Sequence, residues 1–290
     1  MDGGQKQSEP KGSQPAMIKA EFKLWEKART YVIPVLSLAT FALIWEIVSR
    51  SGIVDDRLLP PPSRIFETFV RLAGPGEGGR PDYLIIKHTL STLGLLIGGF
   101  LISAVICTII GVLMGINQRV YEWLNPIVAF FMPIPSFTLV FVFILWVGLG
   151  AETVILTIIV GASFPILYSA AAGVRSSDHK MIWAAQIAGC SRSQIFFKVL
   201  LPGAMGYIIN GQKLALGRAW RAVIGAEMFA STNYGLGFMI HDASSFLDTE
   251  GMFAAIITVG LTGLILERLV FRYLEKSTIE RWGMVSSKSF

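Results

Sequence analysis

The chain of 290 residues is 53% hydrophobic and only 16% charged, whereas soluble domains carry about 25% Asp, Glu, Lys and Arg. This composition excludes an ordinary soluble enzyme or binding domain and indicates an integral membrane protein. The net charge of +5 does not indicate nucleic-acid binding, because most Lys and Arg residues flank apolar runs, where membrane topology accounts for them. We expect membrane lipid, and no nucleic acid, as a partner.

Six apolar runs follow one another along the chain, each long enough to cross a bilayer core of about 30 Å as a helix. They cover residues 30–49, 90–116, 127–147, 153–173, about 203–230 and 251–271. The sequence therefore predicts an all-α, polytopic membrane protein with six transmembrane helices. The transmembrane domain covers residues 30–275 and lies between two polar tails, residues 1–29 and 276–290.

Prolines mark two places in this pattern. Within residues 50–89, a Pro-rich stretch leads into a segment with apolar residues at helical spacing, which predicts an amphipathic helix. The third run contains Pro133 and Pro135. A membrane helix tolerates the carbonyl groups that proline leaves unpaired only where neighbouring groups pair with them, so we expect a kink inside a helix bundle.

The basic residues are distributed unevenly between the connections. Lys and Arg gather in residues 1–29, 117–126, 174–202 and 268–290, and residues 231–250 contain neither. The positive-inside rule therefore predicts that both ends of the chain and the segment 174–202 are cytoplasmic. The N-terminal tail lacks the short apolar core and cleavage site of a signal peptide, so we expect it to be retained.

Cysteine and histidine do not form a metal-binding pattern. Cys107 lies inside an apolar run and Cys190 in a polar segment, without the spacing of a disulfide framework or a metal site. The histidines His88, His179 and His241 are scattered over different regions. We therefore expect no metal site, and no nucleophile with a base or phosphate-binding loop indicates a catalytic site.

The polar segment 174–202 has the signals of two short helices. Ser177 or Asp178 can cap the first helix, and Gly189 can end it. Ser191 begins an S-x-x-Q capping box, which starts a second helix that runs to Pro202. Two readings remain open from the residues alone. The pair lies on the membrane surface with its apolar side chains in the headgroups, or it protrudes and docks into a groove on another protein.

The fifth run is unusual because it contains charged residues, Lys213, Arg218, Arg221 and Glu227. Each is costly in a bilayer centre, so all four are expected to face the bundle interior or a water-filled path. Arg218 and Arg221 are three residues apart and share a helix face, where two guanidinium groups can bind an oxyanion. The alternative is that an arginine is structural and pairs with a carboxylate; the candidates are Glu46, Glu227 and Glu267.

Several motifs resemble one family of transporters. The pattern A-A-x-x-x-G, nine residues and V-x-L-P is formed by Ala184, Ala185, Gly189, Val199, Leu201 and Pro202. It resembles the EAA loop of binding-protein-dependent ABC importer permeases. The stretches LLPPPSRIFETF, LWVGLG and LALGRAWRAVIGAEMF are similar to other motifs of these permeases. The combination resembles the nitrate, sulfonate, taurine and bicarbonate branch and covers residues from about 31 to 275.

The resemblance implies a type I importer fold in the bacterial inner membrane and a coupling role for the segment 174–202. In the family, a cytoplasmic ATPase subunit grips this loop, and the matching coupling residues are Trp183, Ala184, Ala185, Gln186, Gly189, Ser191, Leu201 and Pro202. The glutamate that opens the family motif is Trp183 here. We hypothesise that Trp183 buries against the ATPase instead.

The resemblance also implies the partners of this chain. The sequence has no G-x-x-x-x-G-K-[ST] loop, so ATP and Mg²⁺ are expected on two copies of a separate ATPase subunit. A second permease copy completes the pore, and a soluble binding protein delivers a small anionic solute to the translocation path. Lys213, Arg218, Arg221 and Glu227 are the candidates for lining this path. The alternative class is a secondary transporter driven by an ion gradient.

Overall fold

The computed structural model describes residues 16–55, 57–76 and 83–274. This part of the chain consists of helices and connections, without a strand, and confirms the predicted all-α class. The chain divides into two compact units, Met1–Arg64 and Ile65–Phe290. The first unit contains α1 (Ala16–Arg50).

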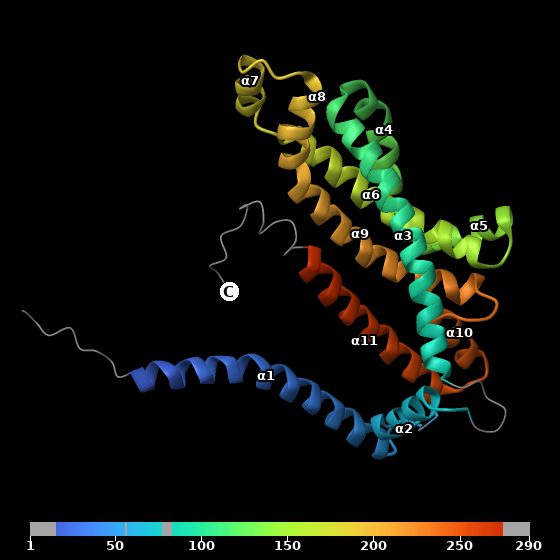
Figure 1. The fold of residues 1–290 in the computed structure, drawn as a ribbon. Coiled ribbons are helices and arrows are strands. Elements are labelled where there is room, and N and C mark those ends of the chain that lie inside the picture. Colours follow the sequence, from blue (N-terminus) through green and yellow to red (C-terminus); the bar gives the residue numbers. More distant parts are fainter. Residues whose placement is uncertain (1–15, 56, 77–82, 275–290) are drawn as a thin grey trace, which may run out of the picture. The chain divides into compact units, whose positions relative to one another are not determined.

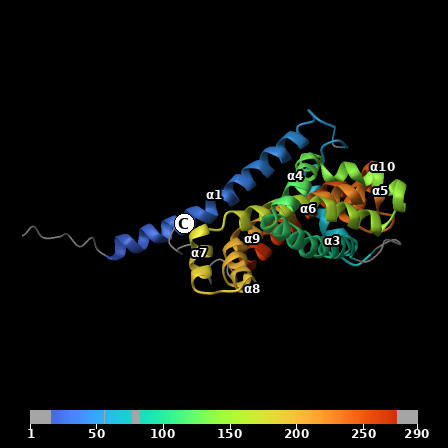
Figure 2. The same cartoon turned by 90° about the horizontal axis from the view of Figure 1, so that it is seen from above.

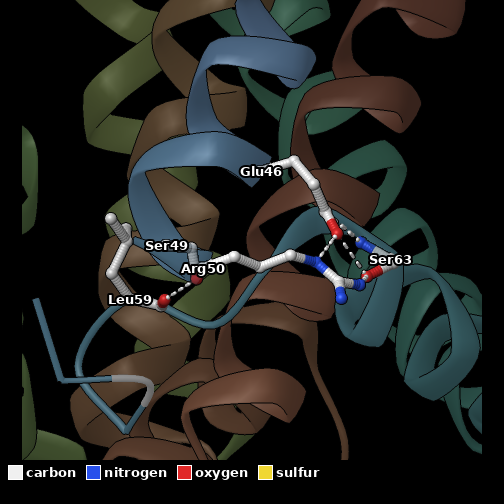
Figure 3. A network of polar contacts seen from close by, with 5 residues as sticks. All are labelled: Glu46, Ser49, Arg50, Leu59 and Ser63. Carbon is white, nitrogen blue, oxygen red and sulfur yellow. Dashed lines mark hydrogen bonds and ion pairs between the residues drawn. The ribbon is translucent and has the colours of Figure 1, made fainter. Parts of the chain in front are cut away.

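Figure 3 shows how the end of α1 is tied to the chain that follows it. Glu46 accepts hydrogen bonds from Ser63 through the backbone N–H at 3.1 Å and the hydroxyl at 2.9 Å. Arg50 forms an ion pair with the same carboxyl group. The buried Ser49 donates to the Leu59 carbonyl at 2.6 Å. Glu46, one of the candidate partners for an arginine of the fifth run, is thus paired with Arg50.

The remaining helices begin with the last turns of α2 and belong to the second unit, which Figures 1 and 2 show from two directions. In chain order they are α2 (Pro62–Ala73), α3 (Leu84–Ile116), α4 (Gln118–Phe131), η1 (Ser136–Leu139), α5 (Val140–Val147), α6 (Ala151–Arg175), α7 (His179–Ile187), α8 (Arg192–Ile195), η2 (Phe196–Leu200), α9 (Leu201–Ala230), α10 (Leu236–Ser245) and α11 (Thr249–Leu274).

The core of the second unit lies between three long helices, α3, α6 and α9, which pack side by side. Small residues permit this close packing. A Cβ atom at Gly111 of α3 would lie 2.7 Å from the Leu167 carbonyl oxygen of α6, so no larger residue fits without a shift. Fully buried side chains fill the space between the helices; they include Leu96, Ile158, Ala162, Ala219 and Val223.

The third apolar run is broken rather than continuous. Helix α4 ends before Pro133, and the chain resumes in η1 and α5 after Pro135 at an angle of 91°. Neither proline has an N–H group to continue the helical ladder, so the break falls at the two positions where the bond is missing. The predicted kink is therefore present, but it is far sharper than a bend within one helix.

Four helical segments of the described chain are long and apolar enough to cross a membrane, or five if the bent pair counts as one crossing. The single segments are Val32–Arg50, Leu84–Ile116, Ala151–Arg175 and Thr249–Leu269. Helix α9 has 30 residues and thus sufficient length, but it is not apolar enough to belong to this group. Six crossings remain a prediction.

The connection at residues 231–250, which the sequence reading treats as a simple link, contains the helix α10. Leu236, Met239 and Ala243 are buried at helical spacing on one of its faces. Helices α7 and α10 lie at opposite ends of α9 in both views (Figures 1 and 2). If α9 crosses the membrane, these two short helices stand on opposite sides of it.

Candidate functional site

The first short helix of the segment 174–202 forms as the sequence predicts. Asp178 caps α7 by accepting a backbone N–H at 2.9 Å. Gly189 adopts a left-handed φ of +75°, and its N–H donates to the Gln186 carbonyl at 3.0 Å. The N–H of Cys190 donates to the Ala185 carbonyl at 3.0 Å. These two bonds form a Schellman motif, which a glycine in the left-handed region favours.

The second short helix differs from the prediction in its end. The capping box is present: the Ser191 N–H donates to the Gln194 side chain at 2.8 Å, and the Gln194 N–H donates to the Ser191 hydroxyl at 3.3 Å. However, the helical path does not end at Pro202. Helix α8 ends at Ile195 and leads through the π-helical turn η2 into α9, where Pro202 lies in the first turn. The wider turn accommodates a residue that has no N–H to donate.

Helix α7 projects from the end of the second unit, as Figure 1 shows. None of its residues is buried. Trp183 is 61% exposed and Ile187 89% exposed, although both are large apolar side chains. The next turn is anchored, because Ile195 is buried and Phe196 packs against the core cluster of α6 and α9. The segment therefore presents an unpartnered apolar helix on a fixed base.

Glu227, near the end of α9, is completely buried and joins three helices. Thr92 of α3 donates to its carboxyl group at 2.9 Å, and the N–H of Gly237 in α10 donates to the same oxygen at 3.0 Å. The Thr92 hydroxyl also accepts the Leu236 N–H at 2.8 Å. This network holds the beginning of α10 against α3 and α9.

Two neighbours complete the surroundings of this carboxyl group. A Cβ atom at Gly235 would lie 2.6 Å from the carboxyl carbon of Glu227, so only glycine permits this approach. The ring nitrogen Nδ1 of the buried His88 lies 3.0 Å from the Gly235 backbone nitrogen. Sequence reasoning did not identify Thr92, Gly235 or His88. The available signal was Glu227 itself, because a membrane-buried carboxyl group requires hydrogen-bond donors.

Arg218 and Arg221 line one cavity of about 370 Å³. Its other walls are the break between α4 and η1, including Pro133 and Ser136, and one face of α6. Arg218 makes a long hydrogen bond of 3.4 Å to the Met132 carbonyl. Among the described residues, no carboxylate forms an ion pair with either arginine.

The four charged residues of α9 thus fall into separate places. The structure brings Arg218 and Arg221 together in the cavity. Lys213 lies earlier on α9 and is not part of the cavity wall, and Glu227 is buried in the network with α10. Glu46 is paired with Arg50 inside the first unit, and the exposed Glu267 forms no ion pair with the two arginines within the described part of the second unit.

Comparisons with known proteins agree with the family resemblance. The family model of the binding-protein-dependent transport system inner membrane component matches residues 107–279, which include the segment 174–202 and all of α9. The taurine transport system permease protein TauC of Escherichia coli (strain K12) is 31% identical over 243 residues, 84% of this chain and 87% of that protein.

Two further relatives are of similar closeness. The putative aliphatic sulfonates transport permease protein SsuC of Bacillus subtilis (strain 168) is 32% identical over 83% of this chain and 84% of that protein. The bicarbonate transport system permease protein CmpB of Synechocystis sp. is 29% identical over 88% of this chain and 91% of that protein. These relatives are named as transport permeases.

The fold is similar to a solved structure. A chain of the MetNI methionine ABC transporter, in an inward-facing conformation, superposes with a TM-score of 0.54 at 21% identity. The match covers 66% of this chain and 96% of that chain. The chain therefore belongs to the family of binding-protein-dependent transport system inner membrane components, in the nitrate, sulfonate, taurine and bicarbonate type of importer permeases.

Proposed function

We propose that this permease moves a small anionic solute through the bacterial inner membrane as part of an ATP-driven importer, with a soluble binding protein delivering the solute. The names of three relatives refer to taurine, aliphatic sulfonates and bicarbonate. Each of these solutes carries an acidic group that is ionised at neutral pH. The shared chemistry of the relatives supports an anion as the solute of this chain.

The proposed assembly contains two copies of this chain around one pore and two copies of a cytoplasmic ATPase subunit. The ATPase holds ATP and Mg²⁺, because this sequence has no P-loop of its own. Both ends of the chain and α7 lie on the cytoplasmic side in this assembly, which agrees with the abundance of Lys and Arg around them. Helix α10 then faces the side from which the binding protein approaches.

The projection of α7 is the observation that carries the coupling role. Its exposed apolar residues, Trp183 and Ile187, have no partner surface among the described residues, and a helix docked in a groove of the ATPase removes them from water. The helical path from α8 through η2 to α9 is continuous. Movement of the ATPase at α7 is therefore passed along α9, which gives alternating access to the pore.

The coupling residues extend from Trp183 to Pro202. Ala184, Ala185 and Gln186 lie on α7 itself, where small side chains allow a partner to approach the backbone closely. Gly189 forms the turn that ends α7, and Ser191 caps the start of α8. Leu201 and Pro202 begin α9 and join the coupling segment to the membrane helix.

The translocation path is proposed to pass along α9. Arg218 and Arg221 line a cavity there, and Lys213 lies on the same helix toward the α7 end. Glu227 supports the path differently, because one of its carboxyl oxygens accepts hydrogen bonds from Thr92 and from the start of α10. We propose that Glu227 positions α10 against α9 at the outer end of the path.

Native mass spectrometry of the gently solubilised protein tests the assembly. Two copies of this chain with two copies of an ATPase subunit are expected. A photo-crosslinking residue at position 186 is expected to attach to the ATPase, because Gln186 is exposed on α7. A chain that is found only with itself, and that transports without ATP when an ion gradient is present, would show that the proposal is wrong.

Two substitutions test the dock. Ile187→Ser removes an exposed apolar side chain from α7, and loss of the ATPase from the purified complex is expected. Phe246→Ala is the matched control: Phe246 is 77% exposed but follows α10 at the other end of α9, so the ATPase should remain bound. Trp183→Glu restores the family's acidic residue. If this change leaves ATPase binding and coupling unaltered, Trp183 is not buried against the partner.

A further inference from the structure

The cavity beside α9 is built by the break in the third apolar run. The prolines end α4 and turn the chain by 91°, which leaves an open space between the break, α6 and α9. On the α6 side the contact is tight, because a Cβ atom at Gly161 would lie 2.9 Å from the Ser136 hydroxyl oxygen. The cavity of about 370 Å³ lies in the size range of small-molecule sites, about 300–1,000 Å³.

The charges around this cavity all have one sign. Arg218 and Arg221 are the only ionisable residues among those that line it, and the rest of the lining is apolar apart from Ser136. No described carboxylate forms an ion pair with either guanidinium group. The Met132 carbonyl, which accepts a hydrogen bond from Arg218 at 3.4 Å, carries no formal charge and therefore leaves the positive charge of Arg218 uncompensated.

Charged side chains in a membrane domain face the bundle interior or a water-filled cavity, and within the described residues neither guanidinium group has a carboxylate partner. Arg218 and Arg221 are one turn apart on α9, so their donors reach the same space. A guanidinium group binds the oxygens of a carboxylate or sulfonate through paired, charge-assisted hydrogen bonds. The Ser136 hydroxyl, which also lines the cavity, supplies a further donor.

We infer that this cavity is an anion-binding site of the permease itself, which takes the carboxylate or sulfonate group of the solute between Arg218, Arg221 and the break at Pro133. The role of the bound anion as the transported solute rests on the proposed function. The negative charge of the ligand is inferred from the cavity alone. Under this inference the permease contributes to specificity after the binding protein has released the solute. A neutral molecule of the same size does not bind.

Protection from arginine modification tests the site directly. The permease–ATPase complex in lipid nanodiscs is treated with phenylglyoxal, which modifies guanidinium groups, and each arginine is followed by peptide mass spectrometry. The probe is methanesulfonate, and its neutral control of similar size is dimethyl sulfone. At a methanesulfonate concentration ten times its Kd, modification of Arg218 and Arg221 should slow about tenfold, as simple occupancy requires. Dimethyl sulfone should have no effect.

Arg119, at the start of α4 and outside the cavity, is the internal control for a general effect of salt. Equal protection of Arg119 by methanesulfonate would overturn the inference, and so would equal protection of the cavity arginines by dimethyl sulfone. An anionic lipid headgroup is the remaining source of an anion, and nanodiscs with and without phosphatidylglycerol are compared to test it. If the anionic lipid protects both arginines and methanesulfonate adds nothing, a lipid headgroup fills the cavity and the inference about the solute is wrong.

A second measurement does not depend on chemical reactivity. Methanesulfonate is expected to raise the unfolding temperature of the wild-type complex, because it binds the folded form. The double variant Arg218→Gln/Arg221→Gln should lose this response, whereas Lys87→Gln, which removes an exposed charge on α3, should keep it. If methanesulfonate still raises the unfolding temperature of the double variant, the anion binds elsewhere and the inference is wrong. If the complex releases its ATPase while methanesulfonate still protects Arg218 and Arg221 from modification, the result counts against the coupling proposal and not against the anion site.

Discussion

Removal of the Thr92 hydroxyl group tests the hydrogen-bond network around Glu227 quantitatively. Thr92→Val keeps the shape of the side chain but removes its oxygen. This oxygen is completely buried, donates to the Glu227 carboxyl group at 2.9 Å and accepts the Leu236 N–H at 2.8 Å. The substitution therefore leaves one buried acceptor and one buried donor with a hydrogen bond fewer, on two different helices.

The expected loss follows from these two bonds. Interhelical hydrogen bonds in a membrane protein contribute on average about 0.6 kcal/mol and at most about 1.7 kcal/mol each. The free energy of unfolding should therefore fall by roughly 1 to 3 kcal/mol for the pair. Thr89 of the same helix provides the matched control. Its hydroxyl donates only to the Ile85 carbonyl of its own helix, so Thr89→Val should change stability by less than about 0.5 kcal/mol.

Unfolding of the two purified variants in mixed micelles, with increasing fractions of a denaturing detergent, measures this difference. Hydrogen exchange at α10 shows its location: the amides at the start of α10 should exchange faster in Thr92→Val than in Thr89→Val, because Leu236 has lost its acceptor. Equal stability of the two variants, with equal exchange at α10, would refute the reasoning that Thr92 joins α3 to α9 and α10.

Three further predictions concern the glycines and the anchor of the coupling segment. Gly189→Ala places a side chain at a φ of +75° and should destabilise the turn by about 1 kcal/mol. The expected result is weaker retention of the ATPase in the purified complex, and unchanged retention would contradict the role of this turn. Gly235→Ala should lower the unfolding temperature more than Gly94→Ala, because a Cβ atom meets the buried carboxyl group in the first case and open space in the second. Ile195→Ala should lower the free energy of unfolding by roughly 2 to 5 kcal/mol, because Ile195 is buried. Ile187→Ala should leave it unchanged, since the Ile187 side chain is 89% exposed. Detergent unfolding curves measure both variants.

Several features could be predicted because they depend on neighbours in sequence. Apolar runs of about 20 residues indicate membrane helices whatever surrounds them. The Asp178 cap, the Gly189 turn and the capping box of Ser191 and Gln194 are formed by residues within a few positions of one another. Local chemistry was thus sufficient to place the boundaries of α7 and the start of α8.

The predicted end of the second short helix was wrong because it depended on local signals alone. The sequence predicts a second helix that runs to Pro202, and a proline inside a helix usually breaks the helical ladder. The π-helical turn from Phe196 to Leu200 avoids this break, and it is held in place by the packing of Phe196 on the core. A contact distant in sequence therefore decided whether the proline ended one helix or began the next.

The sequence by itself determined the class of the protein, the location of its apolar helices and the presence of charged residues within α9. The tertiary structure alone decided what those charges contact. Arg218 and Arg221 share a cavity because the break at Pro133 folds beside them, and one oxygen of Glu227 is hydrogen-bonded because α10 packs its first residues against α3 and α9. The sequence separation of these partners runs from 10 residues, between Glu227 and Gly237, to 135 residues, between Thr92 and Glu227. Their meeting depends on how the helices pack, which the order of residues along one helix does not reveal.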